Sequence, residues 1–325
     1  MKLRPRLLIV MLPALITCGT WNRDNPFDPK GTDIYKAMQE WTAINSGLTN
    51  TSVHALAIGG SGNIFAGTSG GGVFLSTNNG ARWIAVNSGL TNTSVYALAI
   101  SGSAIFAGTL GGGVFLSTNN GAGWTAVNNG LTNTSINALV ISGSAIFAGT
   151  GGGVFLSTNN GAGWTAVNSG LTNTSVYTLA ISGGAIFAGT LGGGAFLSTN
   201  NGARWAGLNS GLPTNTYVFA LATSGDTIFA GTNAGVFHFT GTGASWTAVN
   251  SGLTNTSVYA LAISGGENIF AGTLGGGVFL SRNNGARWAA VDSGLPANTH
   301  VYSFVTNGGD IFAGTNGGVF LSLLP

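Results

Sequence analysis

From residue 41 onward the chain alternates short apolar runs with polar, glycine-rich turns. The run at 95–100 reads Val-Tyr-Ala-Leu-Ala-Ile, and the run at 104–109 reads Ala-Ile-Phe-Ala-Gly-Thr. Two further runs follow at 113–117 and 124–127. Short runs rich in Val, Ile, Phe and Trp between Gly, Asn and Ser turns predict β-strands. The density of Gly and β-branched residues, without a 3.6-residue apolar period, argues against helix.

This group of four strands repeats along the chain. Its tryptophans stand 40 to 42 residues apart, at Trp41, Trp83, Trp124, Trp164, Trp205, Trp246 and Trp288. The phrase Ile-Phe-Ala-Gly-Thr also occurs seven times, beginning at Ile64, Ile105, Ile146, Ile186, Ile228, Ile269 and Ile311. A four-stranded unit of about 40 residues is the period of a β-propeller blade.

The two ends of the repeated region predict how the ring closes. Residues 41–45 match the last strand of a blade, whereas residues 318–322 match the third strand. One blade is therefore expected to take three strands from the C-terminus and its fourth from the N-terminus, which leaves no unpaired radial interface. A solenoid would instead need polar capping repeats. We predict an all-β, seven-bladed β-propeller of four-stranded antiparallel blades over 41–325.

The first 18 residues have the pattern of an export signal. Lys2, Arg4 and Arg6 precede an apolar stretch at 7–17. That stretch is shorter than the roughly 20 apolar residues of a membrane-spanning helix, but it suits the apolar region of a signal peptide.

The stretch from Leu15 to the single cysteine, Cys18, resembles the bacterial lipobox, with Thr17 where Gly, Ala or Ser is usual. The resemblance implies lipidation of Cys18 and anchoring in the outer membrane or at the cell surface. An ordinary secretory signal, with a periplasmic or secreted product, is the alternative. Residues 19–40 contain an Asn-Pro-Phe-Asp-Pro segment and are expected to be a polar tether.

Composition narrows the classes of function. Of 325 residues, 44% are hydrophobic and only 6% are charged, so the chain can bury a core and is not expected to be disordered. The formal net charge is +2, and the basic residues do not cluster beyond the leader, which argues against nucleic acid as a partner. We expect a monomer.

The turn before most of the repeated tryptophans has a recognisable form. Ser76-Thr77-Asn78-Asn79-Gly80-Ala81-Arg82-Trp83 resembles the Asp-box, with Asn78 in place of the aspartate. It recurs at 117–124, 157–164, 198–205 and 281–288. The resemblance is to the Asp-box (BNR) propellers, which include sialidases, sortilin-like receptors, clostridial-type xyloglucanases and photosystem II assembly factor-like proteins. It implies the fold only, because the same turn accompanies many activities.

A glycosidase would need a pair of carboxylates, and residues 41–225 contain no Asp or Glu. The acids that follow are Asp226, Glu267, Asp292 and Asp310, and the first, second and fourth are expected in solvated hairpin turns. The arginines Arg82, Arg204, Arg282 and Arg287 belong to the Asp-box-like turns, which the resemblance places on the outer rim, away from the usual active face. We therefore expect no enzymatic activity, with a sialidase-like or other glycoside hydrolase as the remote alternative.

No cofactor or metal is expected either. His54, His238 and His300 belong to separate repeats and have no Cys, Asp or Glu at ligand spacing. The glycine-rich stretches lead into strands rather than helices, so they are turns and not phosphate-binding loops.

One position varies while its neighbours hardly change. At the second position of the first strand the seven repeats carry His54, Tyr96, Asn137, Tyr177, Phe219, Tyr259 and Tyr302. First strands line a propeller's channel, so these side chains are expected to ring one mouth and to bind a protein, peptide or glycan. The loop at 87–94 borders the same mouth. Packing between blades is the structural alternative for the seven residues, and a leucine-anchored connector between blades is the alternative for the loop. A spacer protein without a ligand is the alternative function.

Overall fold

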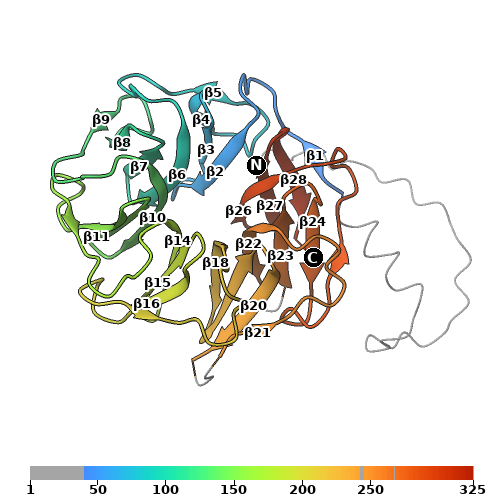
Figure 1. Ribbon diagram of the computed structural model, residues 1–325. Coiled ribbons are helices and arrows are strands. Elements are labelled where there is room, and N and C mark those ends of the chain that lie inside the picture. The colour runs from blue at the N-terminus through green and yellow to red at the C-terminus, as the bar shows by residue number, and fades with distance from the viewer. Residues whose placement is uncertain (1–39, 242–244, 267, 325) are drawn as a thin grey trace, which may run out of the picture.

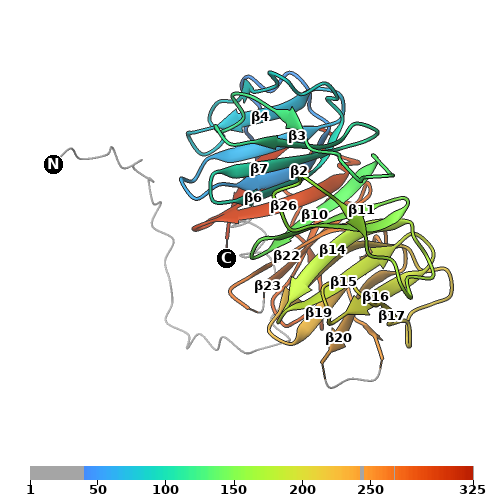
Figure 2. The same ribbon diagram turned by 90° about the vertical axis from the view of Figure 1, so that its left-hand side faces the viewer.

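The computed structural model describes residues 40–241, 245–266 and 268–324. The predicted signal peptide with Cys18, and all of the predicted tether except residue 40, lie outside these residues. Every regular element in the described chain is a β-strand, and the strands form seven four-stranded antiparallel sheets around a central axis (Figures 1 and 2). The predicted fold class is thus confirmed. The described residues include no helix of the length and apolarity needed to cross a bilayer.

The blades are numbered along the chain, and each runs from the axis outward. Blade 1 is β2 (Val53–Ile58), β3 (Ile64–Thr68), β4 (Gly72–Ser76) and β5 (Ile84–Ala85). Blade 2 is β6 (Val95–Ser101), β7 (Ala104–Thr109), β8 (Gly113–Ser117) and β9 (Thr125–Ala126). Blade 3 is β10 (Ile136–Ser142), β11 (Ala145–Thr150), β12 (Gly153–Ser157) and β13 (Thr165–Ala166). Blade 4 is β14 (Val176–Ser182), β15 (Ala185–Thr190), β16 (Gly194–Ser198) and β17 (Ala206–Gly207).

The remaining blades follow the same order. Blade 5 is β18 (Val218–Ser224), β19 (Thr227–Thr232), β20 (Gly235–Thr240) and β21 (Thr247–Ala248). Blade 6 is β22 (Val258–Ser264), β23 (Asn268–Thr273), β24 (Val278–Ser281) and β25 (Ala289–Ala290). Blade 7 is β26 (Val301–Asn307), β27 (Asp310–Thr315), β28 (Gly318–Leu323) and, from the other end of the chain, β1 (Thr42–Ala43).

The outermost strand of blade 2 is shorter than the sequence predicts. The apolar run at 124–127 suggests four residues, but β9 holds only two. The reason is that the Trp124 N–H donates to the carbonyl of Ser88, 2.8 Å away at the end of blade 1, instead of pairing along its own sheet. The tryptophan therefore belongs to the junction between blades.

The same junction repeats around the ring. The indole N–H of each of the seven repeated tryptophans donates to a backbone carbonyl that follows the outer strand of the preceding blade, as in Trp124 Nε1 to Val86 O at 2.7 Å. The other pairs are Trp83 to Ile44, Trp164 to Val127, Trp205 to Val167, Trp246 to Leu208, Trp288 to Val249 and Trp41 to Val291. Because an indole N–H that is buried needs a partner, these bonds fix the distance between neighbouring blades.

The hydrophobic core also lies between blades rather than inside them. Phe106 and Val114 of blade 2 pack with Ile136, Phe155 and Trp164 of blade 3, all of them buried. A blade on its own would expose one of these faces to water, so each blade depends on its neighbours.

The split blade closes the ring as predicted. Thr42 pairs with Leu321 and Ala43 with Phe320, while Trp41, only 2% exposed, packs among residues of blades 6 and 7. In Figure 1, β1 lies against β28 although the two are at opposite ends of the sequence.

The Asp-box-like turn holds together through a serine and an asparagine. In blade 1 the Ser76 hydroxyl accepts a hydrogen bond from Gly80 N at 2.9 Å and donates to Asn78 Oδ1 at 3.0 Å. Asn78 Oδ1 also accepts from Arg82 N at 2.9 Å. Asn79 adopts φ 56° in this turn. The Ser76 and Asn78 side chains thus close the turn through its own backbone N–H groups.

Blade 7 retains the serine without the turn, which gives a matched pair for testing the hydroxyl. Ser322 Oγ is buried without a hydrogen-bond partner among the described residues. We expect Ser76→Ala to destabilise the protein by about 2 kcal/mol, because it leaves the buried Gly80 N–H unpaired. Ser322→Ala removes an unsatisfied group and should be neutral or stabilising by up to about 1 kcal/mol. Urea unfolding of the two variants measures both effects, and equal losses would contradict this account of the turn.

Candidate functional site

A β-bulge at the start of every first strand places the variable residue at the axis. In blade 2 the pairing of β6 with β7 passes from Val95 to Ala97 and skips Tyr96. The same shift occurs in the other six blades. A bulge leaves one residue unpaired and re-aims its side chain. The skipped residues are the seven that vary in the sequence.

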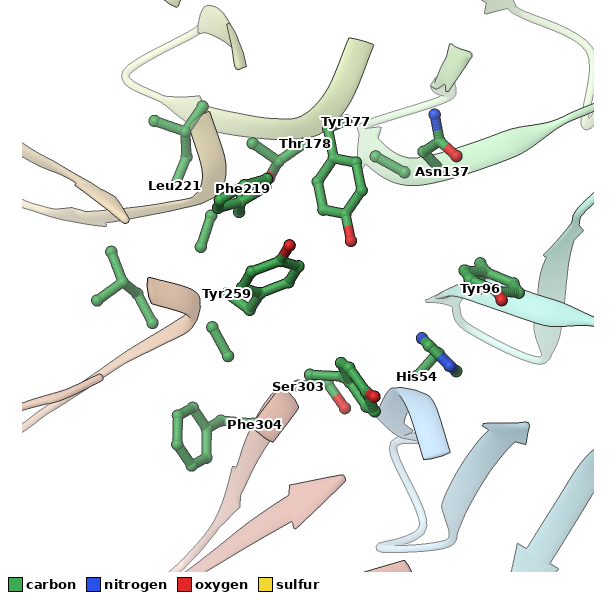
Figure 3. A pocket seen from close by; sticks show the side chains of 15 residues that line it. His54, Tyr96, Asn137, Tyr177, Thr178, Phe219, Leu221, Tyr259, Ser303 and Phe304 are labelled. Carbon is green, nitrogen blue, oxygen red and sulfur yellow. The ribbon is translucent and has the colours of Figure 1, made fainter. Parts of the chain in front are cut away.

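The structure brings all seven side chains together around one pocket of about 240 Å³ at the channel mouth (Figure 3). The residues are His54, Tyr96, Asn137, Tyr177, Phe219, Tyr259 and Tyr302. The next two positions of the first strands complete the wall, with residues such as Ala138, Thr178, Leu221, Ser303 and Phe304. That these residues bind a ligand stays a prediction.

On one side of the pocket His54 is stacked between two tyrosines. Its ring centroid lies 4.3 Å from that of Tyr96, with 28° between the planes, and 4.3 Å from that of Tyr302, with 16°. Burial lowers the pKa of His54 to about 4, because the stacked rings replace the water that would solvate the cation. The imidazole is therefore neutral at physiological pH, and its Nε2 lies 3.2 Å from the Ser52 hydroxyl.

A second aromatic cluster faces the first. Phe219 and Tyr259 stack with their centroids 4.1 Å apart, and Tyr177 meets Phe219 edge-on at 5.6 Å. Burial raises the pKa of Tyr177 to about 12, and the nearby tyrosines add to the shift, so its phenol stays protonated. Figure 3 shows the Tyr177 hydroxyl directed into the open centre and the Tyr259 hydroxyl directed toward the space between Phe219 and Tyr177.

Several polar side chains of the pocket already have hydrogen-bond partners within the protein. Asn137 donates its amide N–H to Val176 O at 2.8 Å. The Tyr96 hydroxyl lies 3.4 Å from Ser69 Oγ, and that of Tyr302 lies 3.3 Å from His300 Nδ1. Among the described residues, the Tyr177 and Tyr259 hydroxyls have no protein partner. Of the lining tyrosines, these two therefore keep their hydroxyls free for a ligand.

The loop at 87–94 supports the ring through its own hydrogen bonds. Asn87 Oδ1 accepts from Val73 N at 2.7 Å, and Asn92 donates to Leu110 O at 3.1 Å and accepts from Ser94 N. Leu90 is buried beneath the loop. The structural alternative therefore accounts for the two asparagines and the leucine of this loop.

The structure also shows exposed apolar side chains around the mouth, which were not predicted from the sequence. Leu110, Leu191 and Leu274 are 47%, 36% and 36% exposed, in the hairpins between the second and third strands of blades 2, 4 and 6. Tyr217, 45% exposed, lies edge-on to Phe219 with centroids 6.1 Å apart. We call these four residues the leucine rim. The signal available in the sequence was a leucine in Thr-Leu-Gly-Gly-Gly where other repeats have Ser, Asn or no residue.

The leucine rim adjoins the pocket through backbone hydrogen bonds. The N–H groups of Leu110, Leu191 and Leu274 donate to the carbonyls of Ser94, Ser175 and Ser257. Each of these serines lies two residues before a pocket tyrosine. The rim therefore borders the same mouth as the pocket.

Charged residues lie away from the pocket lining. Arg82, Arg204 and Arg287 are exposed in the Asp-box-like turns, as expected, and Asp226 is exposed in its hairpin. Asp310 is partly exposed at its hairpin, where its Oδ2 also accepts a hydrogen bond from Asn79 of blade 1 at 2.7 Å. Glu267 lies outside the described residues.

In the part of the chain that the structure describes, no group of three or more His, Cys, Asp or Glu side chains could hold a metal ion. The three histidines therefore do not form a cluster with acidic or cysteine side chains there.

The fold and the site together define a seven-bladed β-propeller with an uncharged, aromatic pocket at one mouth. No protein-family model matches the chain, and no curated protein matches it in sequence.

Solved structures show the same fold at low identity. The extracellular domain of a putative one-component system from B. thetaiotaomicron has a TM-score of 0.74 and 18% identity, over 88% of this chain and 40% of that one. The protein therefore spans less than half of that domain. YCF48 bound to D1 peptide has a TM-score of 0.72 and 13% identity, over 89% and 95% of the two chains. The GH74 xyloglucanase from Xanthomonas campestris has a TM-score of 0.68 and 16% identity, over 88% and 54%.

Proposed function

We propose that the protein is an exported, non-catalytic binding module that holds a protein or peptide partner, or a glycan, at the aromatic mouth of the ring. The observation that carries this proposal is the convergence of the seven variable side chains on one pocket. Packing alone does not require variation at that position, since the flanking residues of the same strands hardly change.

Further observations support a binding function. The neutral His54 and the protonated Tyr177 present aromatic faces and hydroxyls, which suit apolar and hydrogen-bonding groups. The pocket lining among the described residues contains no carboxylate, and glycoside hydrolysis needs a pair of them. One structural neighbour, YCF48, is described with a bound peptide.

Export and anchoring form the other part of the proposal. The leader resembles that of a lipoprotein, and the neighbours with this fold include extracellular domains of a putative one-component and a putative hybrid two-component system. Lipidation at Cys18 would hold the ring at the membrane surface with no spanning segment.

A combined peptide and glycan array, probed with the purified protein, tests the function. We expect at least one specific class of hit, lost in Tyr96→Ala and Tyr177→Ala and retained in Arg82→Ala and Arg204→Ala, which alter the outer rim. A blank array would favour the spacer alternative. Hits that survive both tyrosine substitutions would place the binding surface elsewhere.

A further inference from the structure

The pocket is small and its outline is set by aromatic rings. At about 240 Å³ it lies below the roughly 300–1,000 Å³ of sites that enclose a drug-sized ligand. It has room for one ring-sized group, with the rest of the ligand lying outside on the mouth. The size therefore indicates an anchor that belongs to a larger molecule.

The chemistry of the lining favours an uncharged anchor with few polar atoms. A sugar ring carries a hydroxyl on most of its carbons, and each one that is buried without a partner costs about 1–3 kcal/mol. One Asn137 amide N–H already donates to Val176 O, and of the lining tyrosines only Tyr177 and Tyr259 have hydroxyls without a partner among the described residues. No described lining residue carries a charge at neutral pH, so an ionised anchor would be desolvated without compensation.

The side chains around the pocket also favour an apolar, uncharged ligand. Leu110, Leu191, Leu274 and Tyr217 expose apolar surface at the mouth, whereas the loop asparagines, such as Asn92, are hydrogen-bonded within the ring. Glycan hydroxyls gain little from exposed leucines. Apolar side chains gain roughly 25 cal/mol for each Å² of apolar surface removed from water.

From these observations we infer that the pocket takes one uncharged aromatic or large apolar side chain of a polypeptide, whose neighbouring residues pack on the leucine rim. This inference rests on the proposed function and narrows it to a partner of one chemistry. The two aromatic clusters hold the anchor by stacking and edge-on contacts, and the Tyr177 and Tyr259 hydroxyls hydrogen-bond its backbone or a polar tip.

Selection from a random peptide library on the purified full-length protein tests the inference. We expect the selected peptides to share one Trp, Phe, Tyr or Leu without adjacent charges. Their affinity should fall at least about tenfold in Tyr177→Ala, as for the truncation of a central anchor-binding side chain. It should fall by a similar factor in the triple variant Leu110→Asp, Leu191→Asp, Leu274→Asp.

The matched control is Ile84→Asp. Ile84 is 51% exposed on the outermost strand of blade 1, so this substitution places one Asp, against three in the triple leucine variant, at an exposed apolar position away from the mouth. Peptide binding should be unchanged in it. Unfolding midpoints of all variants within a few degrees of the parent establish that the ring is intact.

The other outcomes separate the two proposals. A neutral glycan ligand lost in Tyr177→Ala but retained in the triple leucine variant would overturn the inference and leave the proposed function standing. Peptides selected for an acidic or basic anchor would overturn the inference as well. Peptide or glycan binding that is insensitive to both variants, or no binding at all, would overturn the proposed site together with the inference.

Discussion

Deletion of residues 41–46 is expected to lower the melting temperature of the protein by roughly 10 °C or more. The segment supplies the outer strand of blade 7 and the Trp41 side chain at the junction with blade 6. Trp41 N donates to Ser293 O at 2.8 Å and its indole N–H to Val291 O at 2.7 Å. Asn45 links to β28 by accepting from Val319 N at 2.7 Å and donating to Gly317 O.

The effect is expected to be large because every blade of the closed ring packs against two neighbouring blades. Without the segment, two surfaces become exposed to solvent. These are the surface of blade 6 that Trp41 covers and the edge of β28. Removing a buried tryptophan alone costs about 3–5 kcal/mol, and the lost hydrogen bonds add to that. Thermal unfolding followed by circular dichroism measures the shift.

Two point variants show how much of the loss in melting temperature comes from each side chain of the segment. Trp41→Ala is expected to reproduce a large part of the loss. Thr42→Ala is expected to change little, because its side chain is exposed and its pairing with Leu321 uses the backbone. If the deletion variant has the same melting temperature as the full-length protein, the closure of the ring contributes no stability.

The second large effect is expected at the glycine that follows each outer strand. Gly130 adopts φ +83°, and a Cβ there would collide with the backbone carbonyl oxygen of Trp164. Gly143 adopts φ +59° in the first hairpin of blade 3, between β10 and β11, and a Cβ there would meet nothing within 4 Å. Both glycines have left-handed backbone, so an alanine at either position is strained by about 1–2 kcal/mol.

The two alanine variants therefore separate strain from crowding. Gly143→Ala should lose only the cost of the left-handed backbone. Gly130→Ala should lose at least about twice as much, because the Trp164 backbone must move and take with it the 2.8 Å hydrogen bond from Trp164 N to Asn129 O. Equal urea midpoints for the two variants would contradict a close approach of the blades at Gly130.

The architecture could be predicted because its determinants are local and repeated. The strands at 95–100, 104–109 and 113–117 are set by apolar runs between glycine turns, and the structure places β6, β7 and β8 within one residue of them. The permuted ends of the repeat predicted the split blade, since only a ring gives residues 41–45 a neighbour. The fourth strand was overestimated because Trp124 hydrogen-bonds to blade 1, a contact that no local pattern encodes.

The candidate site was predicted as a set of residues but not as an arrangement. Variation at Tyr96 and its six counterparts identified them, and the position of first strands at the axis predicted one shared mouth. The bulge that turns Tyr96 inward depends on its pairing with β7, and the stacking of His54 between Tyr96 and Tyr302 joins side chains from blades 1, 2 and 7.

The sequence by itself determined the strands, their grouping in fours, the number of blades and the place where the ring closes. Each of these follows from apolar periodicity and turn residues within one repeat, or from counting repeats. Only the tertiary structure decided that His54 is held neutral, that two aromatic clusters face each other, and that Leu110 borders the pocket. Those features arise where different blades meet, and the distances between blades come from packing the whole ring rather than from any single repeat.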